Sequence, residues 1–390
     1  MVKSSSESPA YAALGASSAK SGVLKAVGEG ATSRYFASPI PDPFGDATRS
    51  FFLHADGAGT KSIVAYLIFR ETGDASVFAS LATDSLVMNL DDIACSGGLS
   101  GLVLSNTIGR NRSCIPDSAI EAVIKGYQEC VSMLRKSGIE IQMSGGETAD
   151  VGDLVRTIIV DSTLCARIPQ AELVDAYRVK PGDLIIGFSS TGQSRHESRP
   201  NSGIGSNGLT LARNVLLSRH YAEAYPEVCD PNIRPELAYR GPYRVTDQFP
   251  GLGMTVGEAL LSPTRSYAPL IRSLLASHWA DVHSLVHCTG GGQTKIKRFG
   301  KGVRFEKSSL FPVPPLFLEI QRCGKIPWDE MYAVFNMGHR LEACVEASAS
   351  ESVVALAHEF GIAAQVIGRV TSSSVENEVV LETAHGTFVY

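Results

Sequence analysis

The sequence has no long hydrophobic run, which excludes a helix that crosses a membrane. One of the longest apolar stretches, Ser62–Phe69, is far shorter than the roughly 20 residues that a membrane-spanning helix requires. The first residues, Met1–Lys20, are rich in serine and alanine and lack the apolar core of a signal peptide. We therefore expect a soluble, cytoplasmic protein without a membrane partner.

Cysteine is present, but never at the spacing of a metal site or a disulfide framework. The eight cysteines are scattered singly, with no C-x-x-C pair and no histidine–cysteine cluster. A chain of 390 residues can bury two hydrophobic cores and needs no disulfide to fold. We expect the cysteines to be buried free thiols in a reducing compartment.

The signatures of several function classes are also missing. The net charge is −5 and no basic stripe carries interleaved aromatic residues, so nucleic acid is not an expected partner. The absence of a G-x-S-x-G elbow disfavours a Ser-His-Asp hydrolase, and no Walker A motif is present. The composition, 44% hydrophobic and 19% charged, is that of an ordinary globular protein.

A glycine-rich polar loop, His54–Lys61, is the most distinctive stretch that the chain does contain. It follows the apolar run Phe51–Leu53 and precedes the apolar run Ile63–Phe69, and we expect both runs to be strands. Glycines let backbone N–H groups approach a phosphate, a lysine adds positive charge, and an aspartate can hold a divalent metal. Alone, such a loop is more often an ordinary hairpin or loop turn.

Three further polar glycine turns follow predicted strands. They are residues 144–150 after a strand at 139–143, residues 189–192 with 205–208 after a strand at 184–188, and residues 289–292 after a strand at 282–288. Any one of them is more typical of a structural turn. Four together indicate phosphoryl transfer, with carboxylates for Mg²⁺, a lysine for the phosphates and backbone amides for a second anion.

Helical periodicity predicts a helix at 77–93 in which Asp84, Met88 and Asp91 share one face. These acids either point into a site or lie on a solvated face. His283 and His287 share one face of the strand 282–288. They are either two metal ligands or, as we favour, one core residue and one polar site residue.

The expected helix caps are Asp117 for a helix at 117–136, Ser206 for a helix at 209–218, and Ser262 for a helix with Pro263 in its first position.

The domain organisation follows from composition. Residues 1–50 are irregular and proline-rich at Pro39–Asp46, so we expect an extended arm rather than a packed element. The polar segment 167–183 is the predicted hinge. We therefore expect an N-terminal domain at 51–168 and a C-terminal domain at 169–390.

Taken together, these motifs resemble the phosphoribosylformylglycinamidine cyclo-ligase (aminoimidazole ribonucleotide synthetase) family. The resemblance runs from Tyr11 to about Val370, nearly the whole chain. The matching motifs, in the family's order, are His54–Lys61, Asp84 with Asp91–Asp92, Gly145–Ala149, Ser206–Gly208, Pro263–Tyr267, His287–Gly292, and Glu330–Tyr332 with Phe335–Gly338.

The resemblance implies an α/β (α+β) fold of two domains, in which the N-terminal mixed sheet pairs across a homodimer and the C-terminal domain is α/β. The N-terminal domain would bind ATP and Mg²⁺, and the C-terminal domain a small ribonucleotide. ATP would phosphorylate the amide oxygen of formylglycinamidine ribonucleotide. The substrate's own nitrogen would then displace phosphate and close the ring of aminoimidazole ribonucleotide, a step of purine biosynthesis.

The resemblance also implies a role for individual residues. Catalysis would rest on Lys61, Asp84 and His287. ATP would contact Asp56, Gly57, Gly59, Thr60, Lys61, Gly145, Gly146 and Glu147. Mg²⁺ would be held by Asp56, Asp84, Asp92 and Glu147. The ribonucleotide would contact Ser206, Asn207, Gly208, Thr289, Gly290, Gly291 and Gly292.

The chain departs from the family pattern in several places. Ala37–Phe44 is proline-rich where the family has a flexible glycine-rich segment, and Ala55 replaces a threonine. Ile204–Gly205 replaces the family's Pro-His, after an insertion that spans Arg195–Arg199. His196 in this insertion is our candidate for the place of the missing histidine.

These departures keep two alternatives open, a non-catalytic nucleotide-binding paralogue and another ATP-using member of the superfamily. Selenophosphate synthetase is disfavoured because the earliest cysteine is Cys95. The hydrogenase-maturation dehydratase is disfavoured because the chain ends without a cysteine. The P-T-R and F-N-x-G motifs favour the cyclo-ligase over thiamine-monophosphate kinase.

Overall fold

The structure, a computed structural model, describes residues 2–3, 8–16, 32–374 and 376–390. The strands are β1 (Val2–Lys3), β2 (Ile40–Pro41), β3 (Arg49–Gly57), β4 (Leu102–Arg110), β5 (Ile141–Asp150), β6 (Ile158–Pro169), β7 (Leu184–Ser189), β8 (Val282–His287), β9 (Val303–Lys307), β10 (His339–Val345), β11 (Ala364–Ser372), β12 (Glu378–Thr383) and β13 (Gly386–Val389). The helices are α1 (Pro9–Ala12), α3 (Lys61–Thr72), α4 (Ala79–Ala94), α5 (Asp117–Lys136), α6 (Leu209–Leu216), α7 (His220–Ala224), α8 (Val256–Leu261), α9 (Ala268–His278), α10 (Pro315–Gly324), α11 (Trp328–Val334) and α12 (Ser350–Glu359). None of these described helices has the length and apolar character needed to cross a membrane.

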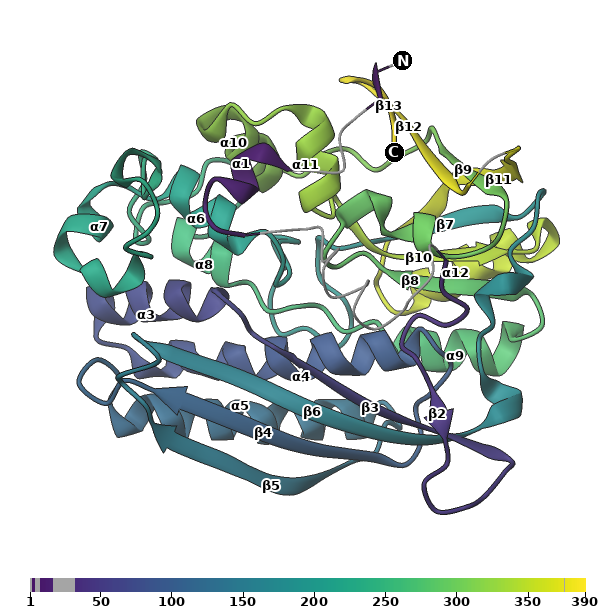
Figure 1. The fold of residues 1–390 in the computed structure, drawn as a ribbon, viewed down its shortest axis with the longest axis horizontal. Coiled ribbons are helices and arrows are strands. Elements are labelled where there is room, and N and C mark those ends of the chain that lie inside the picture. The colour runs from purple at the N-terminus through teal and green to yellow at the C-terminus, as the bar shows by residue number, and fades with distance from the viewer. Residues whose placement is uncertain (1, 4–7, 17–31, 375) are drawn as a thin grey trace.

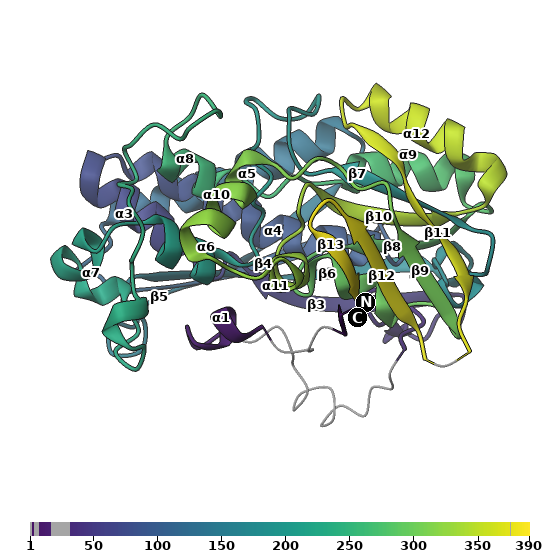
Figure 2. The same cartoon turned by 90° about the horizontal axis from the view of Figure 1, so that it is seen from above.

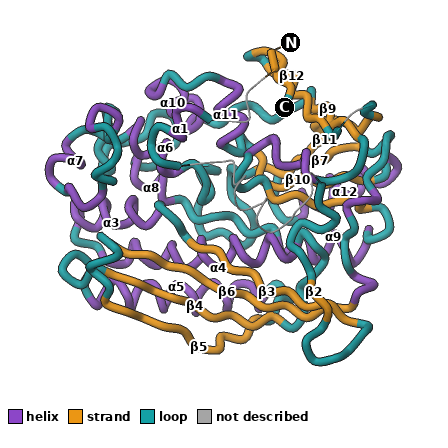
Figure 3. The backbone as a smooth tube through the Cα atoms, in the orientation of Figure 1, coloured by secondary structure: helices purple, strands orange, loops and turns teal. Residues whose placement is uncertain are grey.

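The first half of the chain forms a five-stranded sheet in the order β2-β3-β6-β4-β5. All its neighbours are antiparallel except β4 and β5, which are parallel. Side chains alternate between buried and more exposed along β6, as expected for a sheet with one covered face. Helices α4 and α5 pack together on that covered face, and the strands run side by side beneath them (Figures 1 and 3).

The second half forms an eight-stranded mixed sheet in the order β1-β13-β12-β9-β11-β7-β10-β8. Strands β8 and β10 are buried along their whole length, so both of their faces are covered. Helix α12 packs against β7 and β11, and α9 packs against α12 and α4 (Figure 2). Helix α4 therefore lies between the two sheets, which explains why its acids are buried rather than solvated. The expected mixed α/β architecture is confirmed.

Many expected elements are confirmed, including the strands at 51–53, 184–188 and 282–288 and the helix at 117–136. The predicted strand Ile63–Phe69 is wrong, because this run forms α3. Its β-branched residues suggested a strand, but helical packing buries Val64–Leu67, and the helix ends at Gly73 with a φ of 76°, the left-handed conformation typical of a helix end.

The predicted glycine turn at 144–150 is also wrong. These residues continue β5, the edge strand of the first sheet, and pair with β4 in parallel. A shift of register between Leu104 and Ser105 marks a bulge, and Gly145 takes a φ of 118° there. A bulge absorbs one extra residue without ending the strand, so the glycines mark an irregular strand rather than a turn.

The three predicted helix caps are wrong, and in each case the side chain has another partner or place. The Asp117 carboxylate accepts a hydrogen bond from Arg110 Nη2 at 2.6 Å. Helix α6 begins after Gly208, which leaves the Ser206 hydroxyl free to reach Asp84. Ser262 ends α8, and α9 begins only at Ala268.

The expected extended arm at residues 1–50 lies partly outside the described residues. Two of its described parts contact the rest of the chain. Strand β1 pairs with β13, which brings the two chain ends together (Figure 1), and the Glu330 carboxylate accepts the backbone N–H groups of Ala10 and Tyr11 at 3.2 and 2.9 Å. All eight cysteines are free thiols, as expected, and half of them are buried.

Candidate active site

The expected loop His54–Lys61 is partly strand: it covers the end of β3, which finishes at Gly57, a turn at 58–60 and the first residue of α3. Gly59 takes a φ of 57°, and a Cβ on Gly57 would lie 1.7 Å from Asp161 Oδ1 on β6, so no other residue fits at Gly57 without displacing that acid. No side chain caps the first turn of α3. The N–H groups of Ser62 and Ile63 donate to the carbonyls of Gly59 and Thr60, so it is the positive dipole end of the helix that favours a bound anion.

A buried ion pair joins this loop to α4. Lys61 Nζ lies 2.8 Å from Asp84 Oδ1, both side chains are fully buried, and the ammonium also donates to the carbonyl of Ser262. Asp84 Oδ1 accepts two more hydrogen bonds, from Thr264 N at 2.8 Å and Ser206 Oγ at 3.1 Å. Burial lowers the pKa of Lys61, and the Asp84 charge opposes that change. One carboxylate thus holds together three segments that are distant in sequence.

A second helix N-terminus faces the first. The hydroxyl oxygens of Thr60, at the start of α3, and Thr210, in the first turn of α6, lie 3.0 Å apart. Gly208 precedes α6 with a φ of 76°, and a Cβ there would lie 2.3 Å from the Phe335 ring. The two helix starts therefore converge, and their dipoles add at one place.

The other acids of α4 bind the segment that precedes α9 and the end of β8. Asp91 accepts Ser266 Oγ and Tyr267 N, each at 2.8 Å, and burial raises its pKa to about 7. Asp92 Oδ1 lies 2.7 Å from His287 Nδ1, and Asp92 Oδ2 lies 3.6 Å from His54 Nε2. Burial raises the pKa of Asp92, but His287 and the nearby cations more than offset this, and the net direction is downward.

His287 is fixed in one neutral form. Burial, then the Arg340 charge, lowers its pKa to about 4. Arg340 Nε donates to His287 Nε2 at 3.1 Å, and a guanidinium only donates. The proton of the neutral ring therefore resides on Nδ1, where it is donated to Asp92. His287 is held as a positioning group, with both ring nitrogens engaged.

The turn at 289–292 follows His287 and lies beside the Ser206–Gly208 segment. The atom nearest to a Cβ built on Gly290 is Asn207 Nδ2, at 3.8 Å. Gly292 takes a φ of 49°, and a Cβ there would lie within 2.6 Å of the carbonyl oxygens of Phe335 and Tyr332. The Thr289 hydroxyl accepts a hydrogen bond from Lys295. The predicted substrate residues on these two turns are thus neighbours.

Not every predicted site residue joins this cluster. Gly145, Gly146 and Glu147 lie on β5, and β6 and β4 separate them from Asp56 on β3, a distance of roughly 14 Å from strand spacing. The four predicted metal ligands therefore do not converge within one chain. His283 is hydrogen-bonded to Asp183 at 2.8 Å, at the other end of β8 from His287, so the two histidines do not share a metal.

Family models match both halves of the chain. The chain matches the N-terminal domain model of AIR synthase related proteins over residues 45–168 and the C-terminal domain model over residues 180–380. The chain belongs to the AIR synthase related family.

The phosphoribosylformylglycinamidine cyclo-ligase of Methanocaldococcus jannaschii is 32% identical over 322 residues, 82% of this chain and 78% of the relative. That of Methanococcus vannielii is 30% identical over 336 residues, 85% of this chain and 81% of the relative. Among solved structures, T. maritima PurL complexed with ADP shares the fold, with a TM-score of 0.50 at 12% identity. That match covers 90% of this chain and 44% of the PurL chain, so this protein spans less than half of PurL.

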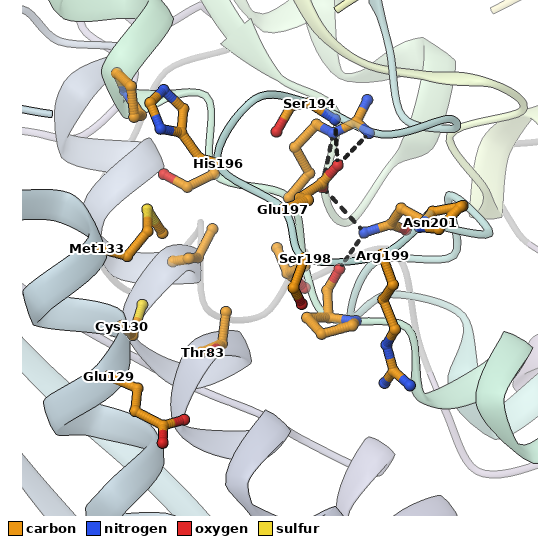
Figure 4. A pocket seen from close by; sticks show the side chains of 17 residues that line it. Thr83, Glu129, Cys130, Met133, Ser194, His196, Glu197, Ser198, Arg199 and Asn201 are labelled. Carbon is orange, nitrogen blue, oxygen red and sulfur yellow. Dashed lines mark hydrogen bonds and ion pairs between the residues drawn. The ribbon is translucent and has the colours of Figure 1, made fainter. Parts of the chain in front are cut away.

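Within this AIR synthase related chain, the insertion loop (residues 193–201) is fastened to the active site by a residue that sequence reasoning missed. Glu197 binds Arg265 through two hydrogen bonds, of 2.9 Å to Nε and 2.6 Å to Nη2 (Figure 4). Asn201 Nδ2 donates to the carbonyl of Pro263 at 2.7 Å. The loop thereby holds the segment that carries Thr264, and it lines a cavity of about 200 Å³ against α4 and α5. Arg265 lies in the recognised P-T-R motif, but nothing in the sequence signals Glu197 as its partner.

The expectation that His196 replaces the family's missing histidine is wrong. The His196 ring packs against Phe360 and faces the Ser137 hydroxyl at 3.3 Å. Beside Gly205, the space that a side chain would fill is occupied instead by Arg340, because a Cβ on Gly205 would lie 2.5 Å from Arg340 Nη1. Arg340 and Asp161 are further residues at this site that the sequence patterns did not single out, and His54 was recognised only as the first residue of its motif.

Proposed function

We propose that the protein converts formylglycinamidine ribonucleotide into aminoimidazole ribonucleotide, with ATP as the phosphoryl donor. The observation that carries the proposal is the convergence of the α3 and α6 starts at Thr60 and Thr210, above the buried Lys61–Asp84 pair. This arrangement offers two anion sites side by side, as transfer of a phosphoryl group between two bound phosphate compounds requires. The cyclo-ligase names of the relatives support the same reaction.

ATP is proposed to bind at the start of α3, through Asp56, Gly57, Gly59, Thr60 and Lys61. Asp56 is the predicted Mg²⁺ ligand on this stretch, and Asp161 lies on the neighbouring strand β6. Burial, then the Asp56 charge, raises the pKa of Asp161, so two acids lie where a cation relieves their repulsion. When bound, Mg²⁺ would neutralise phosphate charge. Asp84 and Asp92, in contrast, are already paired with Lys61 and His287, respectively.

The ribonucleotide is proposed to bind between Ser206–Gly208 and Thr289–Gly292, with His287 fixed beside it. The amide oxygen attacks the terminal phosphorus of ATP, and ADP leaves. The ring-closing nitrogen then attacks the activated carbon, and phosphate leaves with the oxygen. Lys61 stabilises negative charge on the transferred group, and Asp84 holds the ammonium in place.

A homodimer is proposed to form through the outer face of the five-stranded sheet. Leu53, Cys165 and Val103 form one row across β3, β6 and β4, and Leu53 is 64% exposed. An exposed apolar row on a sheet face favours association. Gly145, Gly146 and Glu147 lie on the edge strand of this face, so we propose that they contribute to ATP binding only in the dimer.

The proposed division is an arm at 1–50, an ATP-binding domain at 51–168 and a substrate-binding domain at 169–390, in a cytoplasmic enzyme. The testing experiment measures ADP release and the mass of the product with and without formylglycinamidine ribonucleotide. ADP release that depends on this substrate, with formation of aminoimidazole ribonucleotide, is expected, and K61M should lose about 100-fold or more in kcat. Nucleotide binding without substrate-dependent turnover would contradict the proposal.

A further inference from the structure

Arg340 is a buried cation without an acidic partner. Its side chain is 2% exposed, and its hydrogen bonds run from Nε and Nη2 to His287 Nε2, the uncharged side of a neutral ring. Within the described residues, no carboxylate lies at ion-pair distance from this guanidinium, and Nη1 has no hydrogen-bond partner. A buried charge is costly unless an opposite charge compensates it, so this guanidinium favours an anion beside it.

The backbone conformation directs the Arg340 side chain toward His287 and Gly205. The register of β10 against β7 passes from His339 opposite Ser189 to Leu341 opposite Phe188, so Arg340 is the extra residue of a bulge, a device that redirects a side chain. Met337, two residues before His339, takes a φ of 51°. Gly205 leaves room for the guanidinium, since a Cβ there would lie 2.5 Å from Nη1.

The charged groups near Arg340 come from α3, α4 and β8, and none of them forms an ion pair with it. Its charge is among the causes that lower the pKa of Lys61 and of His287, although burial is the larger cause for both. Asp91 lies within reach of the same charge, but burial raises its pKa to about 7. Lys61 is already paired with Asp84, and the Asp92 carboxylate reaches Arg340 only through the neutral His287 ring. The guanidinium therefore has no direct carboxylate contact in the described part of the chain.

We propose that Arg340 forms, with Gly205 and the start of α6, a subsite for a phosphate-type oxyanion. This inference rests on the proposed function, which supplies two sources of that anion, the ribonucleotide phosphate and the phosphoryl group transferred from ATP. The planar fork of a guanidinium matches the oxygens of a phosphate. His287 Nε2 accepts hydrogen bonds from Nε and Nη2 of the guanidinium, which leaves Nη1 for the anion.

The test compares the wild type with R340M, R340K and the matched control R304M. Arg304 pairs with Glu378 at 2.8 Å on β9, away from the cluster. Binding is measured by calorimetry with ribose 5-phosphate, with ADP, and with inorganic phosphate in the presence of ADP, and folding by urea unfolding. R340M should weaken one of these anions by about 10- to 100-fold, R340K should recover part of the loss, and R304M should remain within about twofold.

The two sources give different results. If the ribonucleotide phosphate binds here, R340M loses ribose 5-phosphate binding and raises KM for the substrate. If the transferred group binds here, R340M loses phosphate binding in the presence of ADP and lowers kcat with KM unchanged. Binding that depends on Arg340 in a protein that makes no product would sustain the subsite and contradict the proposed function. Unchanged binding of all three probes in a folded R340M protein would overturn the subsite.

Discussion

The hydroxyl groups of Thr60 and Thr210 lie 3.0 Å apart, although 150 residues separate them in the chain. Each stands at the start of a helix, α3 in the first half and α6 in the second. The contact therefore fixes the relative position of two helix dipoles whose positive ends face the same space. Because Lys61 follows Thr60 directly, the buried Lys61–Asp84 pair lies at the same junction and should couple its stability to the site.

The first prediction concerns this buried pair. D84N leaves the Lys61 ammonium buried without an opposite charge, and should lower the free energy of unfolding by about 3–5 kcal/mol. K61M leaves the Asp84 carboxylate buried without a cation. The double variant K61M/D84N should therefore lose clearly less stability than the sum of the two single losses. Urea unfolding of the four proteins measures the coupling. The exposed pair Lys125–Glu129, 3.7 Å apart, is the control and should show a coupling of at most about 0.5 kcal/mol. Additive losses at Lys61 and Asp84 would contradict the prediction.

The second prediction concerns two buried groups whose pH effects oppose one another. Asp91 has its pKa raised by burial from 3.8 to about 7, so between these values the folded protein holds a proton that the unfolded chain has released. Stability from Asp91 therefore falls as pH rises across this range. His287 has its pKa lowered by burial, and by Arg340, from 6.5 to about 4, so the unfolded chain holds the extra proton and stability rises with pH.

In the wild type the two effects largely cancel between about pH 4 and 6.5. D91N keeps a side chain of the same shape, able to bond Ser266 and Tyr267, but removes the Asp91 effect. The free energy of unfolding of D91N, minus that of the wild type, should therefore rise by up to about 1.4 kcal/mol per pH unit from about pH 4 to 7 and stay constant above. Urea unfolding over this range measures the difference. A difference that does not change with pH would show that Asp91 does not take up this proton.

The third prediction separates two glycines of one motif. G292A must adopt a φ near 49° with its Cβ within 2.6 Å of two backbone oxygens, and should lose about 3 kcal/mol of stability. G290A has no positive φ to satisfy, and its Cβ meets nothing nearer than Asn207 Nδ2 at 3.8 Å. Its free energy of unfolding should lie within about 1 kcal/mol of the wild-type value. Thermal and urea unfolding distinguish the two, and equal losses would refute the distinction.

The sequence allowed prediction of what depends on local pattern. The prediction of a helix at 117–136 was correct because its apolar residues repeat at helical spacing. The glycine motifs were recognised because the backbone conformation at these positions restricts the residue type. Helix α3 was missed because a buried run rich in isoleucine and valine has no polar face to reveal its period. The continuation of β5 was missed because a bulge uses the same glycines as a turn.

The active-site contacts could not be read from the sequence, because they join residues far apart in the chain. Asp84 meets Ser206 across 122 positions, and Asp92 meets His287 across 195. Which carboxylate serves a lysine, a histidine or a metal depends on those pairings, so the motif supplied Asp84 and Asp92 but not their partners. The position of Arg340 depends in addition on a bulge in β10, which no residue pattern announces.

The last prediction concerns the insertion loop, where two charged residues two positions apart differ in burial. Arg265 is only 3% exposed, and Glu197 supplies both oxygens to it, so E197Q should lower the free energy of unfolding by about 3 kcal/mol. It should also lower kcat, because Thr264, the neighbour of Arg265, helps to hold Asp84 against Lys61. R199M, the matched control, removes an exposed contact of 3.9 Å to Glu258 and the smallest of the charge effects on the Lys61 pKa, and should cost at most about 0.5 kcal/mol with little change in kcat. Urea unfolding and initial rates measure both variants. If E197Q and R199M behave alike, the loop does not hold the active site through Arg265.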